Sequence, residues 1–125
     1  MKASPELTDW ILSYYKAIDA GDIDTVMTYF AEDARSRFGN GEFVYGREAI
    51  REDLAAKSQG VKKISHHFNN IWDAGDGVIV LDASMEFTRH DGITVPANSA
   101  GLFRHRDRLW TEQLHYVDLN EVFGA

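Results

Sequence analysis

The stretch "VKKISHHFNNIWDAGDGVIVLDASMEFTR", residues 61–89, indicates the fold of this chain. Two runs rich in aromatic and β-branched residues flank the turn "AGDG", residues 74–77. A turn this short joins antiparallel neighbours, so the stretch predicts a β-hairpin. The first run also carries two histidines and two asparagines, which half-buried strands usually avoid. Such side chains indicate either a solvated edge or the polar wall of a pocket.

Two further strand-like segments follow the hairpin. They are "ITVPANSAGLFRHR", residues 93–106, and "LWTEQLHYVDL", residues 109–119. The turn "HDG" precedes the first of them and "RDR" precedes the second. Short turns again predict antiparallel pairing. The second half of the chain is therefore expected to form four long antiparallel strands.

The first half of the chain has helical spacing instead. Residues 4–21 predict a helix, with Ser4 as its N-cap, Pro5 in its first turn and Gly21 as its stop. Residues 22–34, up to and beyond Phe30, predict a second helix.

Residues 47–60 predict a third helix, and residues 35–46 between the last two predict a short hairpin or loop. Helices gathered first and strands gathered last predict an α+β domain, in which three N-terminal helices pack on one face of a curved antiparallel sheet. We expect one domain over residues 1–125.

Composition narrows the classes of function. The net charge of −7 argues against nucleic acid as a partner, because a phosphate backbone is bound mainly by Lys and Arg clusters. The apolar runs are too short to span a bilayer, so no membrane partner is expected. The start, "MKASPELTDW", lacks the apolar stretch of a secretory signal, and the chain has no cysteine. These features favour a cytoplasmic protein without a thiolate metal site.

Alternation along the hairpin assigns the side chains to faces of the sheet. In its second strand the apolar set points toward the helices, and it comprises Ile79, Leu81, Ala83, Met85 and Phe87. In its first strand the more apolar face comprises Ile64, His66, Phe68, Asn70 and Trp72. His66 and Asn70 are thus expected inside among aromatic rings, where an unpaired polar group costs about 1–3 kcal/mol. Each needs a partner, a water or a ligand.

The order of elements resembles the cone fold of the nuclear transport factor 2-like superfamily. "YYKAIDAGDIDTVMTYFAEDA" with "GREAIRE" is similar to the first half of ketosteroid isomerases and SnoaL-like polyketide cyclases. "HHFNNIW", "EFTRHDG", "RDRLW" and "HYVDL" are similar to the second half of SnoaL-like proteins. The resemblance covers nearly the whole chain. It implies the fold more firmly than the function, because one fold carries many activities.

Residue by residue, the resemblance to ketosteroid isomerases is incomplete. Their oxyanion-hole tyrosine corresponds to Tyr14, which is retained. The position of their general-base aspartate corresponds to Phe38, and that of their second acid corresponds to about Gly101. Without a carboxylate base, proton abstraction beside a carbonyl by that route has no agent. Ketosteroid isomerase activity is therefore not expected.

Limonene-epoxide hydrolases resemble the chain near "HYVDL", but their Asp-Arg-Asp set is missing as well. One aspartate would stand at His115, and the other two groups would stand near Ala83 and Ser84 or Met85. Epoxide hydrolase activity is not expected either.

The polar groups left to act inside the cone are Tyr14, His66 and His115, which we predict to be the catalytic residues. A neutral histidine can take and return a proton near pH 7, because its ordinary pKa is about 6.5. A tyrosine hydroxyl can donate to a carbonyl or enolate oxygen. Scytalone dehydratase, which has this fold, is similar in placing tyrosine and histidine around its pocket. The predicted ligand-binding residues are Trp10, Phe30, Phe38, Asn70 and Trp72.

Two functions stay open at this point. One is a cofactor-independent lyase, isomerase or cyclase that acts on an apolar, oxygenated compound of polyketide or steroid type. The other is a non-catalytic module that binds or senses a small apolar ligand. No cofactor and no metal are expected, because no His-x-His or Glu-x-x-His helical pair is present. A homodimer through the outer face of the sheet, which carries His67 and Asn69, is expected from the resemblance.

Overall fold

The hairpin expected at residues 61–89 is formed by β3 (Lys63–Gly75) and β4 (Val78–Thr88). This and all other elements are seen in a computed structural model, which describes residues 1–123. The strands pair from Lys63 with Thr88 to Gly75 with Val78. The turn between them uses positive φ angles at Gly75, Asp76 and Gly77, which suits a two-residue connection.

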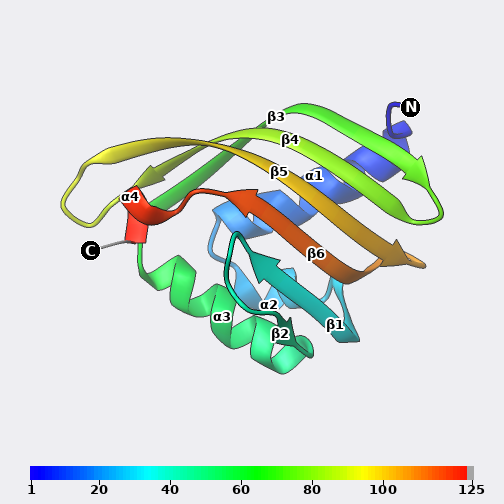
Figure 1. The fold of residues 1–125 in the computed structure, drawn as a ribbon, viewed down its shortest axis with the longest axis horizontal. Helices are drawn as coiled ribbons and strands as arrows, with labels where there is room; N and C mark the ends of the chain where they lie inside the picture. Colours follow the sequence, from blue (N-terminus) through cyan, green and yellow to red (C-terminus); the bar gives the residue numbers. More distant parts are fainter. Residues whose placement is uncertain (124–125) are drawn as a thin grey trace.

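Six strands make one curved sheet that lies over the helices (Figure 1). Its order is β2 (Val44–Tyr45), β1 (Phe30–Phe38), β6 (Leu109–Val117), β5 (Thr94–Arg106), β4 and β3. The pairs β3–β4, β4–β5 and β5–β6 are antiparallel, as the short turns predicted. The pair β1–β6 is parallel, so the sheet is not wholly antiparallel. The two strands are far apart in sequence, and no tight turn constrains their relative direction.

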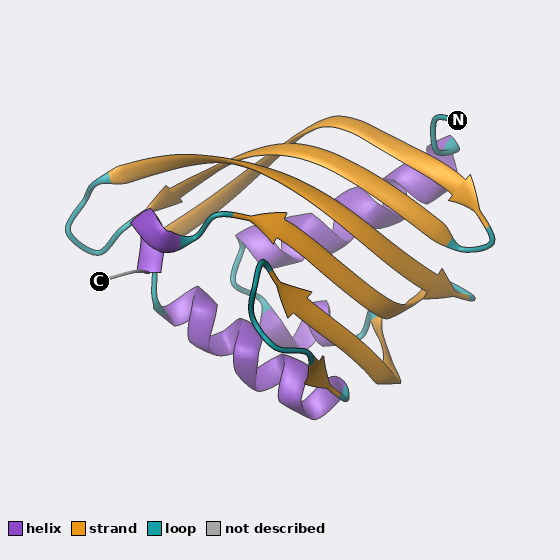
Figure 2. Cartoon of the chain, viewed as in Figure 1, coloured by secondary structure: helices purple, strands orange, loops and turns teal. Residues whose placement is uncertain are grey.

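The helices lie together on the concave face of the sheet (Figure 2). They are α1 (Pro5–Asp19), α2 (Ile23–Met27) and α3 (Arg47–Gln59), and a short α4 (Asn120–Phe123) stands at one end of the sheet. Helix α1 begins as predicted, because the Ser4 side chain accepts a hydrogen bond from the Leu7 amide at 3.1 Å. The α+β class predicted from the sequence is confirmed.

The second predicted helix is shorter than expected. Helix α2 ends at Met27, and Phe30 opens strand β1 instead of continuing the helix. Within β1, Ala34 and Ser36 are buried while Arg35 between them is exposed. The strand is stabilised by hydrogen bonding to β6, a partner that lies some 80 residues further along the chain and that local propensity cannot predict. The expected hairpin at residues 35–46 is the pairing of β1 with β2.

A β-bulge in β3 changes the faces that alternation predicted. Phe68 lies opposite Ala83, but Asn70 lies opposite Asp82, so one extra residue has been inserted between them. The inward direction of His66 and Phe68 is as predicted. Beyond the bulge the faces are reversed, and Ile71 instead of Asn70 packs against the core.

The apolar core is concentrated under one half of the sheet. Its largest fully buried side chains are Trp110, Tyr14, Phe30, Phe103 and Ile11. A smaller cluster with Phe87 and Val122 closes the end near α4. The space between these two clusters is where the cavity described below lies.

The β3–β4 turn gives a matched test of backbone packing. At Gly77 a Cβ atom would lie 2.3 Å from the carbonyl oxygen of His105, whereas at Gly75 it would meet nothing within 4 Å. Both glycines have positive φ. We expect Gly75→Ala to lower the free energy of unfolding by roughly 1–2 kcal/mol through backbone strain alone. Gly77→Ala should lose at least about 1 kcal/mol more through the clash. Urea denaturation of both variants checks this, and equal losses would contradict it.

Candidate functional site

A cavity of about 100 Å³ lies between the helices and the concave face of the sheet. Its wall is mostly apolar, and prominent members are Ile18, Leu54, Phe68, Leu81, Met85 and Phe103. Gly21, Lys57, Ser58 and Phe123 also line it and are reached by solvent. They lie after α1, at the end of α3 and on α4, so the cavity opens at this end of the molecule. An apolar cavity with a few convergent polar groups is the usual form of a small-molecule site.

The first polar group in the cavity is His66, which is held by Asp19. The imidazole Nδ1 of His66 lies 2.5 Å from one carboxylate oxygen of Asp19. The backbone amide of His66 donates to the other oxygen at 3.0 Å. Because a carboxylate oxygen accepts, Nδ1 carries the proton, and Nε2 is the nitrogen that can act on a molecule in the cavity. His66 is thus fixed in one orientation and one tautomer.

Aromatic rings surround the His66 imidazole on the cavity side. The Tyr15 ring lies 4.7 Å from it and the Phe68 ring 6.0 Å, the latter stacked nearly parallel. Only 8% of the His66 side chain is exposed. Burial raises the pKa of Tyr15 well above its ordinary value, so Tyr15 lines the cavity as an uncharged side chain.

The second polar group is a buried set formed by Tyr14, Gln113 and His115. Gln113 Nε2 donates to the Tyr14 hydroxyl oxygen at 3.2 Å, and His115 Nε2 lies 3.1 Å from Gln113 Oε1. Gln113 itself is fully buried. The Tyr14 hydroxyl in turn donates to Gln113 Oε1 at 3.4 Å, which is a long hydrogen bond. An oxygen atom in the cavity at a shorter distance would compete with Gln113 for this proton.

Burial keeps both titratable members of this set neutral. It is the main reason that the pKa of His115 is lowered to about 3, and repulsion from His66 and Lys57 acts in the same direction. Burial also raises the pKa of Tyr14, and the hydrogen bond from Gln113 opposes this only in part. The His115 ring is stacked on Phe38 at 3.9 Å with an interplanar angle of 4°. Near neutral pH, His115 is thus an uncharged lining residue that is hydrogen-bonded to Gln113.

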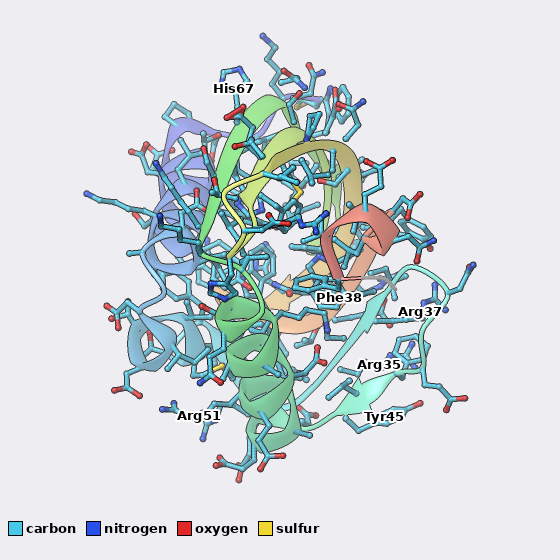
Figure 3. The ribbon with its side chains drawn as sticks, turned by 90° about the vertical axis from the view of Figure 1, so that its left-hand side faces the viewer. Arg35, Arg37, Phe38, Tyr45, Arg51 and His67 are labelled. Atoms are coloured by element: carbon cyan, nitrogen blue, oxygen red, sulfur yellow. The ribbon has the colours of Figure 1, made fainter. Side chains whose placement is uncertain are left out.

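Four of the eight predicted site residues line the cavity. They are Tyr14, His66, His115 and Phe38. Figure 3 shows Phe38 pointing inward beside α3, whereas the neighbouring Arg37 and Arg35 point outward. His67 points away from the helices in the same view, as the sequence predicted.

The other four predicted residues lie elsewhere and do not line this cavity. The centre of the Trp10 ring lies 4.4 Å from that of Trp110, and Trp10 packs against the core cluster to which Trp110 belongs. Phe30 is only 1% exposed and belongs to the solid part of the core.

The β3 bulge accounts for the remaining two. It turns Asn70 outward, where the amide donates to Asp82 at 2.9 Å. Trp72 lies opposite Val80 on the same outer face.

Sequence reasoning did not predict three residues that shape the site, Asp19, Gln113 and Lys57. Asp19 had a detectable signal, because an acidic residue in the last turn of a helix opposes the helix dipole and needs another partner. Gln113 occupies a buried position of β6 between Glu112 and Leu114, and this local sequence gives no signal of its burial. In the sequence, Lys57 is an ordinary basic residue in the last turn of α3. Its position at the cavity depends on how α3 packs, which the sequence does not show.

Comparison with known families agrees with this architecture. The model of the SnoaL-like domain matches residues 11–113. The chain belongs to the SnoaL-like domain family. Comparison with curated proteins finds no match.

Solved structures show the same fold in proteins of low sequence identity. A Catenulispora acidiphila protein with a ketosteroid isomerase-like fold, in complex with trimethylamine, has a TM-score of 0.82 and 20% identity, over 96% of this chain and 91% of that one. The epoxide hydrolase/cyclase-like enzyme SalBIII of polyether salinomycin has a TM-score of 0.82 and 15% identity, over 96% of each chain. TerC, co-crystallised with polyporic acid, has a TM-score of 0.80 and 19% identity, over 98% of this chain and 100% of that one.

In this SnoaL-like domain the positions that the family resemblance pointed to do face the cavity. Phe38, Gly101, His115 and Ala83 all line it. No Asp or Glu is among the described lining residues. A Cβ atom at Gly101 would lie 2.9 Å from the Phe103 ring, so a carboxylate there would not fit without rearrangement.

Two classes of site find no support in residues 1–123 of the SnoaL-like domain. No three His, Asp or Glu side chains of this range come together as a metal ion would require. No helix in it is both long enough and apolar enough to cross a bilayer.

The buried His115 of the SnoaL-like domain should make acid destabilising. Below pH about 6.5 the unfolded chain binds a proton at this residue, but the folded protein keeps the pKa of His115 near 3. Protonation therefore favours unfolding as the pH falls through this window. We expect the free energy of unfolding of His115→Gln to depend less on pH, by up to about 1.4 kcal/mol per pH unit. Urea titrations between about pH 6 and 4.5 measure this difference, and parallel curves would contradict it.

Proposed function

We propose that this SnoaL-like domain is a cofactor-independent enzyme that moves a proton on an apolar, oxygenated small molecule. The observation that carries the proposal is the Asp19–His66 pair. Asp19 contacts Nδ1 of His66, which leaves Nε2 for a molecule in the apolar cavity that His66 lines. An imidazole held in one tautomer by a carboxylate is the usual form of a histidine base. The carboxylates of ketosteroid isomerases are replaced by a base of different chemistry.

The chemistry follows from the two polar groups of the cavity. His66 Nε2 removes a proton from a carbon next to a carbonyl, and the electron pair passes to the carbonyl oxygen. The Tyr14 hydroxyl donates a hydrogen bond to that oxygen as charge develops on it. Asp19 stabilises the imidazolium that forms. Return of the proton to another carbon gives isomerisation, and its delivery to a hydroxyl leaving group gives dehydration with loss of water.

The relatives of this fold support a small-molecule role in general terms. SalBIII is described in pyran ring formation, and TerC was co-crystallised with polyporic acid. These are properties of those proteins. At identities below 25% they support the fold and the class of ligand, and the reaction proposed for this chain rests on His66.

A non-catalytic ligand-binding module is the second candidate. The observation that favours it is that His115 and Tyr14 are both bonded to Gln113 within the protein. Polar groups that are already satisfied need no reacting substrate. Such a module would bind apolar compounds and transform none of them.

A nitrobenzisoxazole probe separates the two candidates without knowledge of the substrate. A base removes its single heterocyclic C–H proton, the N–O bond breaks, and a coloured phenolate forms. We expect the protein to exceed free imidazole by about 10²-fold or more, because a base in an apolar cavity is positioned and little solvated. His66→Ala should lose this gain, and Asp19→Asn should lose about tenfold.

The matched control is His67→Ala, which removes the neighbouring imidazole on the outer face. It should keep the full rate. A wild-type protein that is no faster than imidazole, while it still binds the probe, would favour the binding module and refute the enzyme.

We also propose that the protein is a homodimer through the outer face of the sheet. Leu102 and Tyr116 on neighbouring strands β5 and β6 are 37% and 48% exposed. Both alternate with inward residues, so both belong to the outer face. Leu114 lies opposite Leu102 and Ala100 opposite Tyr116, which makes the apolar surface continuous across the two strands. Such a surface suits a self-complementary contact.

The dimer is tested by placing a charge on this surface. Leu102→Glu should raise the dissociation constant at least about thirtyfold, because a carboxylate would be buried against apolar groups. Light scattering at micromolar concentration should then show a monomer. Leu12→Glu is the control, since Leu12 is 43% exposed but lies on α1 in the opposite layer. A wild-type monomer would refute the proposal.

A further inference from the structure

The cavity has an uneven distribution of charge. Among its described lining residues, Lys57 is the one side chain with a permanent charge. Asp53, which pairs with Lys57, does not line the cavity. The Asp19 carboxylate lies behind His66 and is also outside the lining. A molecule in the cavity therefore meets apolar groups, neutral polar groups and one ammonium ion.

The position of Lys57 links it to His115. Its Nζ lies 4.4 Å from the centre of the Phe38 ring, on which the His115 ring is stacked. The effect of this charge reaches His115, because Lys57 is one of the groups that lower the pKa of that residue. The ammonium ion thus lies over the Phe38 ring, next to the cavity that a planar ligand would occupy.

The ion pair of Lys57 leaves its charge available. Nζ lies 2.8 Å from both carboxylate oxygens of Asp53, one turn earlier in α3. The two side chains are 27% and 28% exposed, at the mouth of the cavity. A partly exposed pair of this spacing is weak because water screens it. Asp53 orients the ammonium ion without preventing it from meeting a second anion.

We infer that the cavity selects ligands with one anionic group, a carboxylate or an ionised phenol or enol, held at the mouth by Lys57. The inference rests on the proposed small-molecule function of the cavity. The apolar body of the ligand would lie among apolar lining residues such as Phe68, Leu81 and Met85. The anion would meet Lys57 at the solvent-reached end, and the rest of the ring system would extend toward His66. A neutral ligand would leave the ammonium ion with Asp53 alone.

Naphthoate and its carboxamide, naphthamide, form a probe pair of nearly equal shape. We expect the wild-type protein to bind naphthoate at least about tenfold more tightly at low salt, since a charged contact at a partly desolvated site is worth that much. The preference should shrink at high salt. Fluorescence titration measures both affinities. Shifts of the His66 and His115 ring signals in NMR show that the probes occupy the cavity.

Substitutions assign the preference to Lys57. Lys57→Met should reduce the naphthoate-to-naphthamide ratio to near one and leave the naphthamide affinity within about twofold, because methionine keeps the aliphatic stem. Lys57→Arg should keep the preference, and Asp53→Asn should increase it by freeing the ammonium ion. Lys2→Met makes the same change in net charge next to the N-terminus, which lies at the other end of the molecule from α4 (Figure 1), and should change nothing.

The inference is overturned if the wild-type protein binds both probes equally, binds neither at millimolar concentration, or keeps its preference in Lys57→Met. These results are independent of the nitrobenzisoxazole test, which measures the base His66. A failure of His66 as a base with a preserved preference at Lys57 would leave an anion-selective binding module. Thermal melts of each variant show whether a loss of binding comes from unfolding.

Discussion

The contact between the Asp19 carboxylate and His66 joins the two layers of this protein where the cavity begins. One oxygen accepts from the backbone of β3 and the other contacts the imidazole, so a single side chain at the end of α1 fixes both the strand and the ring. Hydrogen bonds to a charged group contribute about 1.5–3 kcal/mol each. The carboxylate also lies at the end of a helix where the dipole disfavours negative charge. The imidazole provides the compensating partner.

The cavity exists because the core is divided. One cluster contains Trp110 and Phe103, and a smaller cluster near α4 contains Phe87 and Val122. Between them lies the cavity, which residues of both clusters line, among them Leu81 and Phe87. Gly101 belongs to this region, and its contact with the Phe103 ring leaves no space for even a methyl group. Side chains of both clusters therefore determine the shape of the site.

Three of the polar side chains that line the cavity have different surroundings, namely His66, His115 and Lys57. His66 is paired with the Asp19 carboxylate. His115 is buried without a carboxylate and stays neutral, with its pKa lowered to about 3. Lys57 at the mouth is permanently charged. Two histidines of one cavity thus have different electrostatic surroundings because their neighbours differ.

The sequence by itself determined the α+β class, the antiparallel strands of the second half, and the inward direction of His66. These features follow from local periodicity, turn residues and capping, which act over a few residues. The helix expected to pass Phe30 and the inward faces expected for Asn70 and Trp72 were wrong. Pairing with the distant strand β6 overrode helical spacing in the first case, and one inserted residue in β3 reversed the alternation in the second.

The partnership of Asp19 with His66, the burial of Gln113 and the place of Lys57 at the mouth were decided by the tertiary structure alone. Each is a contact between segments whose distance depends on how the helices pack on the sheet, and short-range spacing carries no information about that distance.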